Sequence, residues 1–212
     1  MPIFNSQKYA LALHTTTPQL GIALSNFAGD SRTQIWDLGQ DLSTHLHQYL
    51  TKILQPQTWQ DLAFIAVAKG PGGFTGTRIG VVTARTLAQQ LDIPLFGIST
   101  LAAVAWSAKK EVNANYLLAV QMKARRGQLF VGIYQFSADG ESWQTYLADT
   151  TMTPEAWQQT LASLDLPYKL IEASQNLANT VNSILELAYL EWQQQKYSSW
   201  SEVLPFYGQH PV

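Results

Sequence analysis

The sequence of 212 residues contains no cysteine, few charged residues and no long hydrophobic run. Without cysteine the chain cannot form a disulfide, a cysteine-ligated zinc or iron–sulfur centre, or a thiol nucleophile. Charged residues make up 13% of the chain and sum to a net charge of −2, so no general attraction to nucleic acid or anionic membranes is expected. No stretch reaches the roughly 20 apolar residues of a transmembrane helix, and residues 1–8 lack the pattern of a signal peptide. We therefore expect a cytoplasmic protein.

The apolar residues that are present fall into short strands and amphipathic helices. They make up 46% of the chain, which is enough for a sizeable core. Residues 62–68 form an unbroken apolar run and are expected to be a central strand. We expect an α/β protein of two lobes, 1–108 and 109–212, divided within 106–114, whose C-terminal segment can pack back on the first lobe. Strands are predicted at 9–14, 19–25, 32–38, 62–68, 93–97, 116–122, 129–136, 143–147 and 168–171, and helices at 42–54, 75–91, 100–109, from 153 and at 176–195.

A glycine-rich segment, KGPGGFTG at residues 69–76, lies between a predicted strand and a predicted helix. Glycines at such a place let backbone amides converge on an anion, so Gly70, Gly72 and Gly73 are candidate cofactor-binding residues. The segment is not a P-loop, and Thr75 stands where a dinucleotide fingerprint needs its third glycine. A tight turn without a ligand is an equally good interpretation.

Small residues recur every four positions along the predicted helix 75–91, at Gly76, Gly80, Ala84 and Ala88. They leave one ridge of the helix almost without side chains, so another element can approach closely. That element is either a partner protein or the chain's own sheet. We predict that the interface with a partner consists of this ridge and two residues of the predicted helix 42–54, Leu46 and Tyr49.

Residues 69–88, KGPGGFTGTRIGVVTARTLA, closely resemble the signature of the TsaB (YeaZ) family. Segments 10–25, 97–101 and 124–127 also fit. The resemblance implies a fold of the actin-like, sugar-kinase and Hsp70 class. It also implies a protein that supports the tRNA threonylcarbamoyladenosine enzyme TsaD, with a TsaE-like ATPase as a further partner. Within the family, pairing with TsaD and self-association are placed at the helices that correspond to 42–54 and 75–91.

Four positions depart from the acidic and metal-binding residues of the wider class. His14 stands where the first strand usually ends in an aspartate, and Lys123 where an aspartate often precedes Ala-Arg. Thr100 and Val104 align with two metal-binding histidines of TsaD. The resemblance therefore implies no catalytic residue and no metal site in this chain. It implies no cofactor in the isolated chain either, with ATP or ADP bound only in an assembled complex.

We interpret the sequence as a non-catalytic partner subunit in tRNA N6-threonylcarbamoyladenosine synthesis. One alternative is an autonomous kinase or ATPase of the actin-like class, and a second is a metallopeptidase-like protein. His45 and His47 lie two positions apart on a helix, a spacing that does not suit one metal ion. The basic turn 123–126 is expected to be solvated, so contact with tRNA is expected only through the partner.

Overall fold

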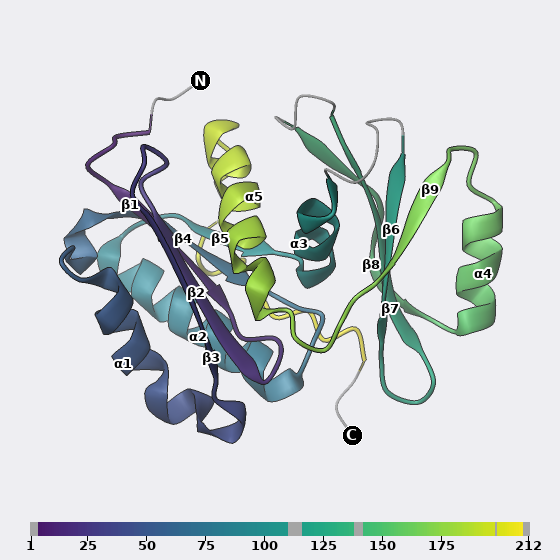
Figure 1. Cartoon of the computed structure of the whole chain (residues 1–212), viewed down its shortest axis with the longest axis horizontal. Coiled ribbons are helices and arrows are strands. Elements are labelled where there is room, and N and C mark those ends of the chain that lie inside the picture. Colours follow the sequence, from purple (N-terminus) through teal and green to yellow (C-terminus); the bar gives the residue numbers. More distant parts are fainter. Residues whose placement is uncertain (1–3, 110–115, 138–141, 198, 210–212) are drawn as a thin grey trace.

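The computed structural model describes residues 4–109, 116–137, 142–197 and 199–209. Two β-sheets lie on either side of two helices, so that the molecule has two lobes (Figure 1). Among the described residues, no helix combines the length and the apolar character that a membrane span requires.

The first sheet has the strand order β3-β2-β1-β4-β5. It is parallel except for β2, which pairs antiparallel with both β1 and β3. β1 lies in the middle and β4 is the interior strand beside it. Six of the seven β4 side chains are buried, as an apolar run with helices on both faces requires. The strands are β1 (Tyr9–His14), β2 (Gln19–Ser25), β3 (Ser31–Asp37), β4 (Leu62–Ala68) and β5 (Leu95–Ile98).

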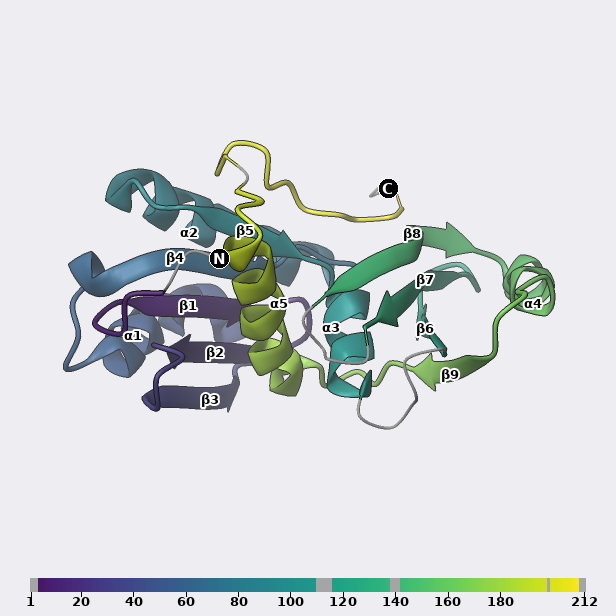
Figure 2. The ribbon, with the colours of Figure 1, turned by 90° about the horizontal axis from the view of Figure 1, so that it is seen from above.

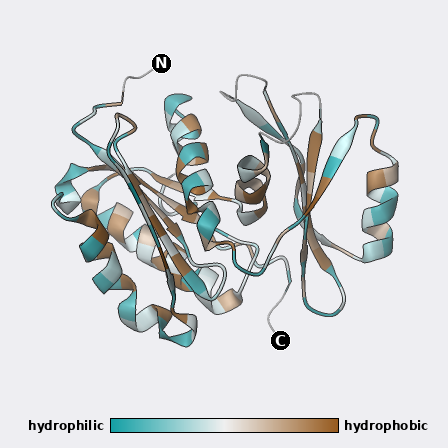
Figure 3. Ribbon diagram, in the orientation of Figure 1, coloured by the Kyte–Doolittle hydropathy of each residue, from teal (hydrophilic) through white to brown (hydrophobic). Residues whose placement is uncertain are grey.

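Helices cover both faces of this sheet. On the outer face lie α1 (Leu42–Leu54) and α2 (Phe74–Leu91), which share one apolar core with β1, β2 and β4. On the inner face lies α5 (Val181–Gln193), which packs on small residues such as Ala10 and Ala66. α3 (Thr100–Ser107) fills the space between α5 and the second sheet. Its first seven residues are all buried, and Figure 3 shows brown segments along the side of the helix in view.

The second sheet has the order β8-β7-β6-β9, in which β6 and β9 are parallel and the other pairs antiparallel. Its outer face is covered by α4 (Pro154–Ala162), which buries Trp157 and Leu161. The sequence predicts the start of α4 correctly, because the Thr153 side chain accepts a hydrogen bond from the amide of Ala156. The strands are β6 (Leu117–Lys123), β7 (Leu129–Phe136), β8 (Trp143–Met152) and β9 (Tyr168–Glu172), and the short 3-10 helices of the chain include η1 (Gly39–Asp41), η2 (Trp59–Asp61) and η4 (Ala178–Thr180).

The predicted α/β class with two lobes of mixed sheets and flanking helices is confirmed. The predicted helix 176–195 begins instead with η4 and continues as α5. α5 and Val203, both assigned to the second lobe by the boundary at 109, contribute to the cores on either face of the first sheet. Residues 110–115 of the predicted boundary lie outside the described residues.

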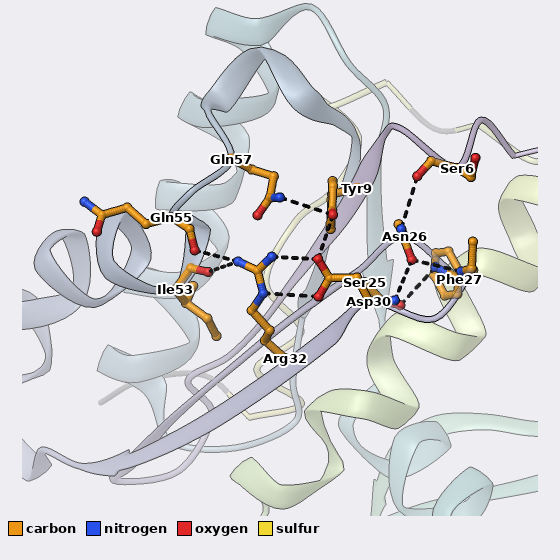
Figure 4. Close-up of polar contacts among 11 residues, drawn as sticks. Ser6, Tyr9, Ser25, Asn26, Phe27, Asp30, Arg32, Ile53, Gln55 and Gln57 are labelled. Carbon is orange, nitrogen blue, oxygen red and sulfur yellow. Dashed lines mark hydrogen bonds and ion pairs between the residues drawn. The ribbon is translucent and has the colours of Figure 1, made fainter.

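A polar network ties the β2–β3 hairpin to the end of α1 (Figure 4). Arg32 forms an ion pair with Asp30 at 2.7 Å, and its guanidinium also donates to the carbonyl of Gln55 at 2.6 Å. The hydroxyl of Tyr9 donates to Asp30 at 2.7 Å. The Arg32 side chain lowers the pKa of Asp30, and so does the Tyr9 hydrogen bond to a smaller extent. The network therefore fixes the edge of the first sheet against the helix that covers it.

Candidate functional site

The glycine-rich loop at 70–73 is enclosed by three other segments of backbone. The Gly73 amide donates to the carbonyl of Thr16 at 2.7 Å, and the carbonyl of Gly70 accepts from the amide of Thr100 at 2.9 Å. A Cβ atom on Gly70 would lie 2.3 Å from the carbonyl oxygen of Phe206, and one on Gly72 would lie 2.5 Å from Thr16. Gly70 also has φ +104°, which favours glycine. Close packing of backbones thus accounts for Gly70 and Gly72 without a bound phosphate. The assignment of these two residues and Gly73 to a cofactor stays a prediction.

The small-residue ridge of α2 faces the chain itself. Gly80, Ala84 and Ala88 are buried, and a Cβ on Gly80 would lie 2.0 Å from the hydroxyl of Thr15. A Cβ on Gly76 would lie 2.1 Å from the carbonyl oxygen of Thr15. This corrects the interpretation of the ridge as a surface for a partner: its small residues let α2 approach the end of β1.

Leu46 and Tyr49, the two α1 residues of the predicted interface, differ in how deeply they are buried. Leu46 is 1% exposed and belongs to the outer-face core. Tyr49 is half-buried and stacks on Trp36 with ring centroids 4.3 Å apart. Leu46 is therefore a core residue in this fold, whereas Tyr49 lies at the margin of the surface.

A partner that docks on α1 and α2 would meet other residues of these helices. Val82 is 51% exposed and Phe74 36% exposed. The remaining exposed side chains of the two helices are polar or basic: Ser43, Thr44, His47, Gln48, Thr51, Lys52, Thr75, Arg78, Thr86, Gln89 and Gln90. The outer face of the two helices thus combines two exposed apolar side chains with hydroxyl groups and carries few charges.

His14 ends β1 and is fully buried. Neither ring nitrogen has a hydrogen-bond partner among the described residues. Burial lowers the pKa of His14 from 6.5 to about 3, so the imidazole is neutral at physiological pH. A neutral imidazole without a neighbouring carboxylate offers little to a Mg²⁺–phosphate group.

The positions compared with the metal-binding histidines of TsaD lie in the core. Thr100 is fully buried and donates to the Thr16 hydroxyl at 3.3 Å, and Val104 is 6% exposed. Of the two neighbouring histidines of α1, His45 is half-buried and His47 is exposed. Over the described part of the chain, no cluster of three or more His, Cys, Asp or Glu side chains could hold a metal ion.

A hydrogen-bonded chain joins the two lobes beside α3. The hydroxyls of Ser99, at the start of α3, and Tyr134, on β7, lie 3.1 Å apart. Tyr134 in turn donates to the carboxylate of Asp149 on β8. Burial raises the pKa of both groups, and the Asp149 carboxylate raises that of Tyr134 further.

Glu191 and Lys69 are two further charged residues near these hydrogen-bonded side chains. Burial raises the pKa of Glu191, on α5, from 4.5 to about 7, while Lys69 and Lys196 lower it. Lys69, at the end of β4, also acts to lower the pKa of Asp149. Lys69 thus lies within electrostatic reach of two largely buried carboxyl groups, one from each side of the lobe junction.

The sequence is similar to known proteins along most of its length. Residues 40–202 match the family model "TsaD: tRNA N6-adenosine threonylcarbamoyltransferase". The chain is 33% identical over 159 residues to the tRNA threonylcarbamoyladenosine biosynthesis protein TsaB of Bacillus subtilis, covering 74% of this chain and 67% of that protein. The chain belongs to the TsaB (YeaZ) family. The TsaB of Haemophilus influenzae is 28% identical and aligns over 95% of this chain and 94% of its own length.

Solved structures support the TsaB fold. YeaZ from Pseudomonas aeruginosa superposes with a TM-score of 0.74 at 22% identity, over 94% of this chain and 99% of that chain. A second structure, described as having similarity to peptidase YEAZ from the same organism, gives 0.75 at 21% identity over 95% and 100%. The two-lobed arrangement of this TsaB-family chain is therefore shared along almost its whole length.

The hydrogen bonds that link Ser99, Tyr134 and Asp149 between the lobes of this TsaB-family protein could not be predicted from the sequence. Ser99, Tyr134 and Asp149 come from three elements that the sequence does not place together, and no spacing marks them as a set. Asp149 lies just beyond the predicted strand 143–147, whereas β8 continues to Met152 and brings Asp149 to Tyr134.

Proposed function

We propose that this chain is a non-catalytic partner subunit in the biosynthesis of tRNA threonylcarbamoyladenosine, and that it binds and supports a TsaD-like threonylcarbamoyltransferase. The observation that carries the proposal is membership of the TsaB family, whose named members are tRNA threonylcarbamoyladenosine biosynthesis proteins. The burial of His14, Thr100 and Val104 supports a role without chemistry of its own, because none of these side chains faces an open site.

In this role the reaction takes place on the partner. The TsaD-like subunit would transfer the threonylcarbamoyl group from its adenylate to N6 of an adenosine in tRNA, and would make the main contacts to the tRNA. A TsaE-like ATPase is a further partner, and ATP or ADP would bind only in the assembled complex. The complex would act in the cytoplasm.

The docking surface in this proposal is the outer face of α1 and α2. Val82 and Phe74 supply exposed apolar area on that face, and the surrounding hydroxyl groups can hydrogen-bond across an interface. The low number of charges there suits a surface that is desolvated on binding, since burying an unpaired charge is costly. The ridge of Gly80 and Ala84 would support this face from beneath.

The experiment is co-purification of the chain with the TsaD-like protein of the same host, followed by modification of tRNA by the pair. Val82→Asp should abolish co-elution in size-exclusion chromatography and the modification that depends on it. Tyr146→Asp is the matched control, because Tyr146 is 49% exposed on β8 in the other lobe, and it should leave both unchanged. Retained binding by Val82→Asp would place the interface elsewhere. Turnover of Mg–ATP by the isolated chain would contradict the non-catalytic role.

A further inference from the structure

Residues 203–209 run from the first lobe to the second across one side of the molecule (Figure 2). On the first lobe, Val203 is buried in the outer-face core beside Gly97. The amide of Phe206 donates to the carbonyl of Lys69 at 2.7 Å. The ring of Tyr207 packs on Phe74, with centroids 4.4 Å apart. The segment is thus anchored at the end of β4 and at the start of α2.

The same segment is then held by the second lobe. The hydroxyl of Thr151, on β8, donates to the carbonyl of Gly208 at 2.8 Å. The Gln209 side chain bonds both ways with the turn between β6 and β7: its oxygen accepts from the amide of Arg125 at 3.2 Å, and its nitrogen donates to the carbonyl of Arg125 at 3.1 Å. That nitrogen also lies 2.6 Å from the side-chain oxygen of Gln128. Six residues after Val203, the chain is therefore attached to a different sheet.

Glycines permit this close fit at both ends. The Phe206 carbonyl takes the space where Gly70 would carry a Cβ. Gly208 has φ +63°, and a Cβ there would lie 2.6 Å from the ring of Phe130. The segment also bonds to the backbone of Lys69, which is within electrostatic reach of Asp149. It therefore packs against the start of the glycine-rich loop and then reaches the second lobe.

We propose that residues 203–209 are a strap that holds the two lobes in one relative orientation, and that releasing the strap from the second lobe lets the lobes hinge. The strap is an extended segment that makes few contacts, and these contacts lie near the surface. The contacts of α3 and α5, in contrast, are buried in the core. Contacts like those of the strap open first when a protein fluctuates locally. The Ser99–Tyr134 hydrogen bond and the packing of α3 against the second sheet then remain between the lobes.

The test uses the full chain and two ways of releasing the strap. One variant ends at Leu204. The other combines Gln209→Ala with Thr151→Val, which removes the attachments to the second lobe and leaves those to the first. The matched controls are a chain that ends at Gln209, and Gln194→Ala combined with Thr145→Val, two exposed residues away from the strap.

Because the chain has no cysteine, Ser43→Cys on α1 and Gln158→Cys on α4 give a unique pair of spin-label sites, one on each lobe. Pulsed electron resonance should show one narrow distance in the parent and the controls, and a broadened or second distance in both released variants. Amide hydrogen exchange of β1 and β2 should stay slow in the released variants, which checks that the first sheet remains folded. If the shortened chain does not fold, the paired substitution decides. An unchanged distance distribution in that variant would overturn the proposal.

Discussion

Replacing Gly80 by alanine tests whether the α2 ridge packs on the chain itself. In an open helix this change stabilises by about 1 kcal/mol, because glycine has the larger backbone entropy to lose on folding. Here the added Cβ would lie 2.0 Å from the Thr15 hydroxyl, which donates to the carbonyl of Gly76 at 2.8 Å. Either that hydroxyl rotates away and loses its bond, or α2 moves off the sheet.

The opposing contributions can be compared. Leaving a buried hydroxyl and its acceptor unpaired costs about 1–3 kcal/mol, and overpacking a close contact costs about 1–3 kcal/mol more. These penalties exceed the propensity gain, so Gly80→Ala should lower the free energy of unfolding by about 1–5 kcal/mol. Thr86→Ala, at an exposed position of the same helix, is the control and should change stability by a few tenths of a kcal/mol.

Urea unfolding of a double-mutant cycle with Thr15→Ala is the assay. Thr15→Ala removes the hydroxyl and the methyl group and leaves the Thr15 Cβ at 3.2 Å from the added one. In that background Gly80→Ala should cost at least about 1 kcal/mol less, the size of coupling expected for residues in contact. A gain in stability from Gly80→Ala alone, equal with and without Thr15, would show that the ridge is open and refute the reasoning.

Two buried titratable groups predict opposite dependences of stability on pH. The pKa of His14 is about 3 when folded and 6.5 when unfolded, so the unfolded chain binds more protons between these values and stability falls as the pH drops below 6.5. His14→Gln should remove about 1.4 kcal/mol per pH unit of that slope, measured by urea unfolding from pH 6.5 to 5; an unchanged slope would mean that the imidazole is solvated. The pKa of Glu191 is 4.5 when unfolded and about 7 when folded, so its contribution is lost as the pH rises through that range. Glu191→Gln should therefore raise stability at pH 8 by up to about 3 kcal/mol and change it little at pH 4.5, and a gain of equal size at both values would contradict the assignment.

Much of the fold could be predicted because its signals are local. The strand Tyr9–His14 and the helix Leu42–Leu54 have the bounds read from apolar periodicity, and Thr153 caps its helix as its residue type indicates. The direction in which the α2 ridge faces could not be predicted. Periodicity identifies a bare face of a helix, but what covers that face depends on where Thr15 lies in space.

The candidate site was harder to predict for the same reason. The sequence marks His14 as a departure from the family pattern, but its complete burial is a property of the assembled fold that no local pattern indicates. Ser99 and Asp149 carry no pattern in the sequence, since their role depends on two sheets meeting. The inward position of Leu46 follows from its place on the apolar face of α1, which also made it a poor choice for an interface residue.

The return of the chain to the first sheet has a consequence for synthesis on the ribosome. The inner face of that sheet exposes Phe64 and Phe96 until α5 covers them, and α5 is not complete until residue 193. A nascent chain of 108 residues therefore contains the five strands and the outer-face helices α1 and α2, but it lacks α5, which covers the inner face. Contacts so distant in sequence form slowly and leave apolar surface open in the meantime. The first lobe should consequently fold only after the second has been made, and an excised fragment 1–108 should aggregate rather than fold.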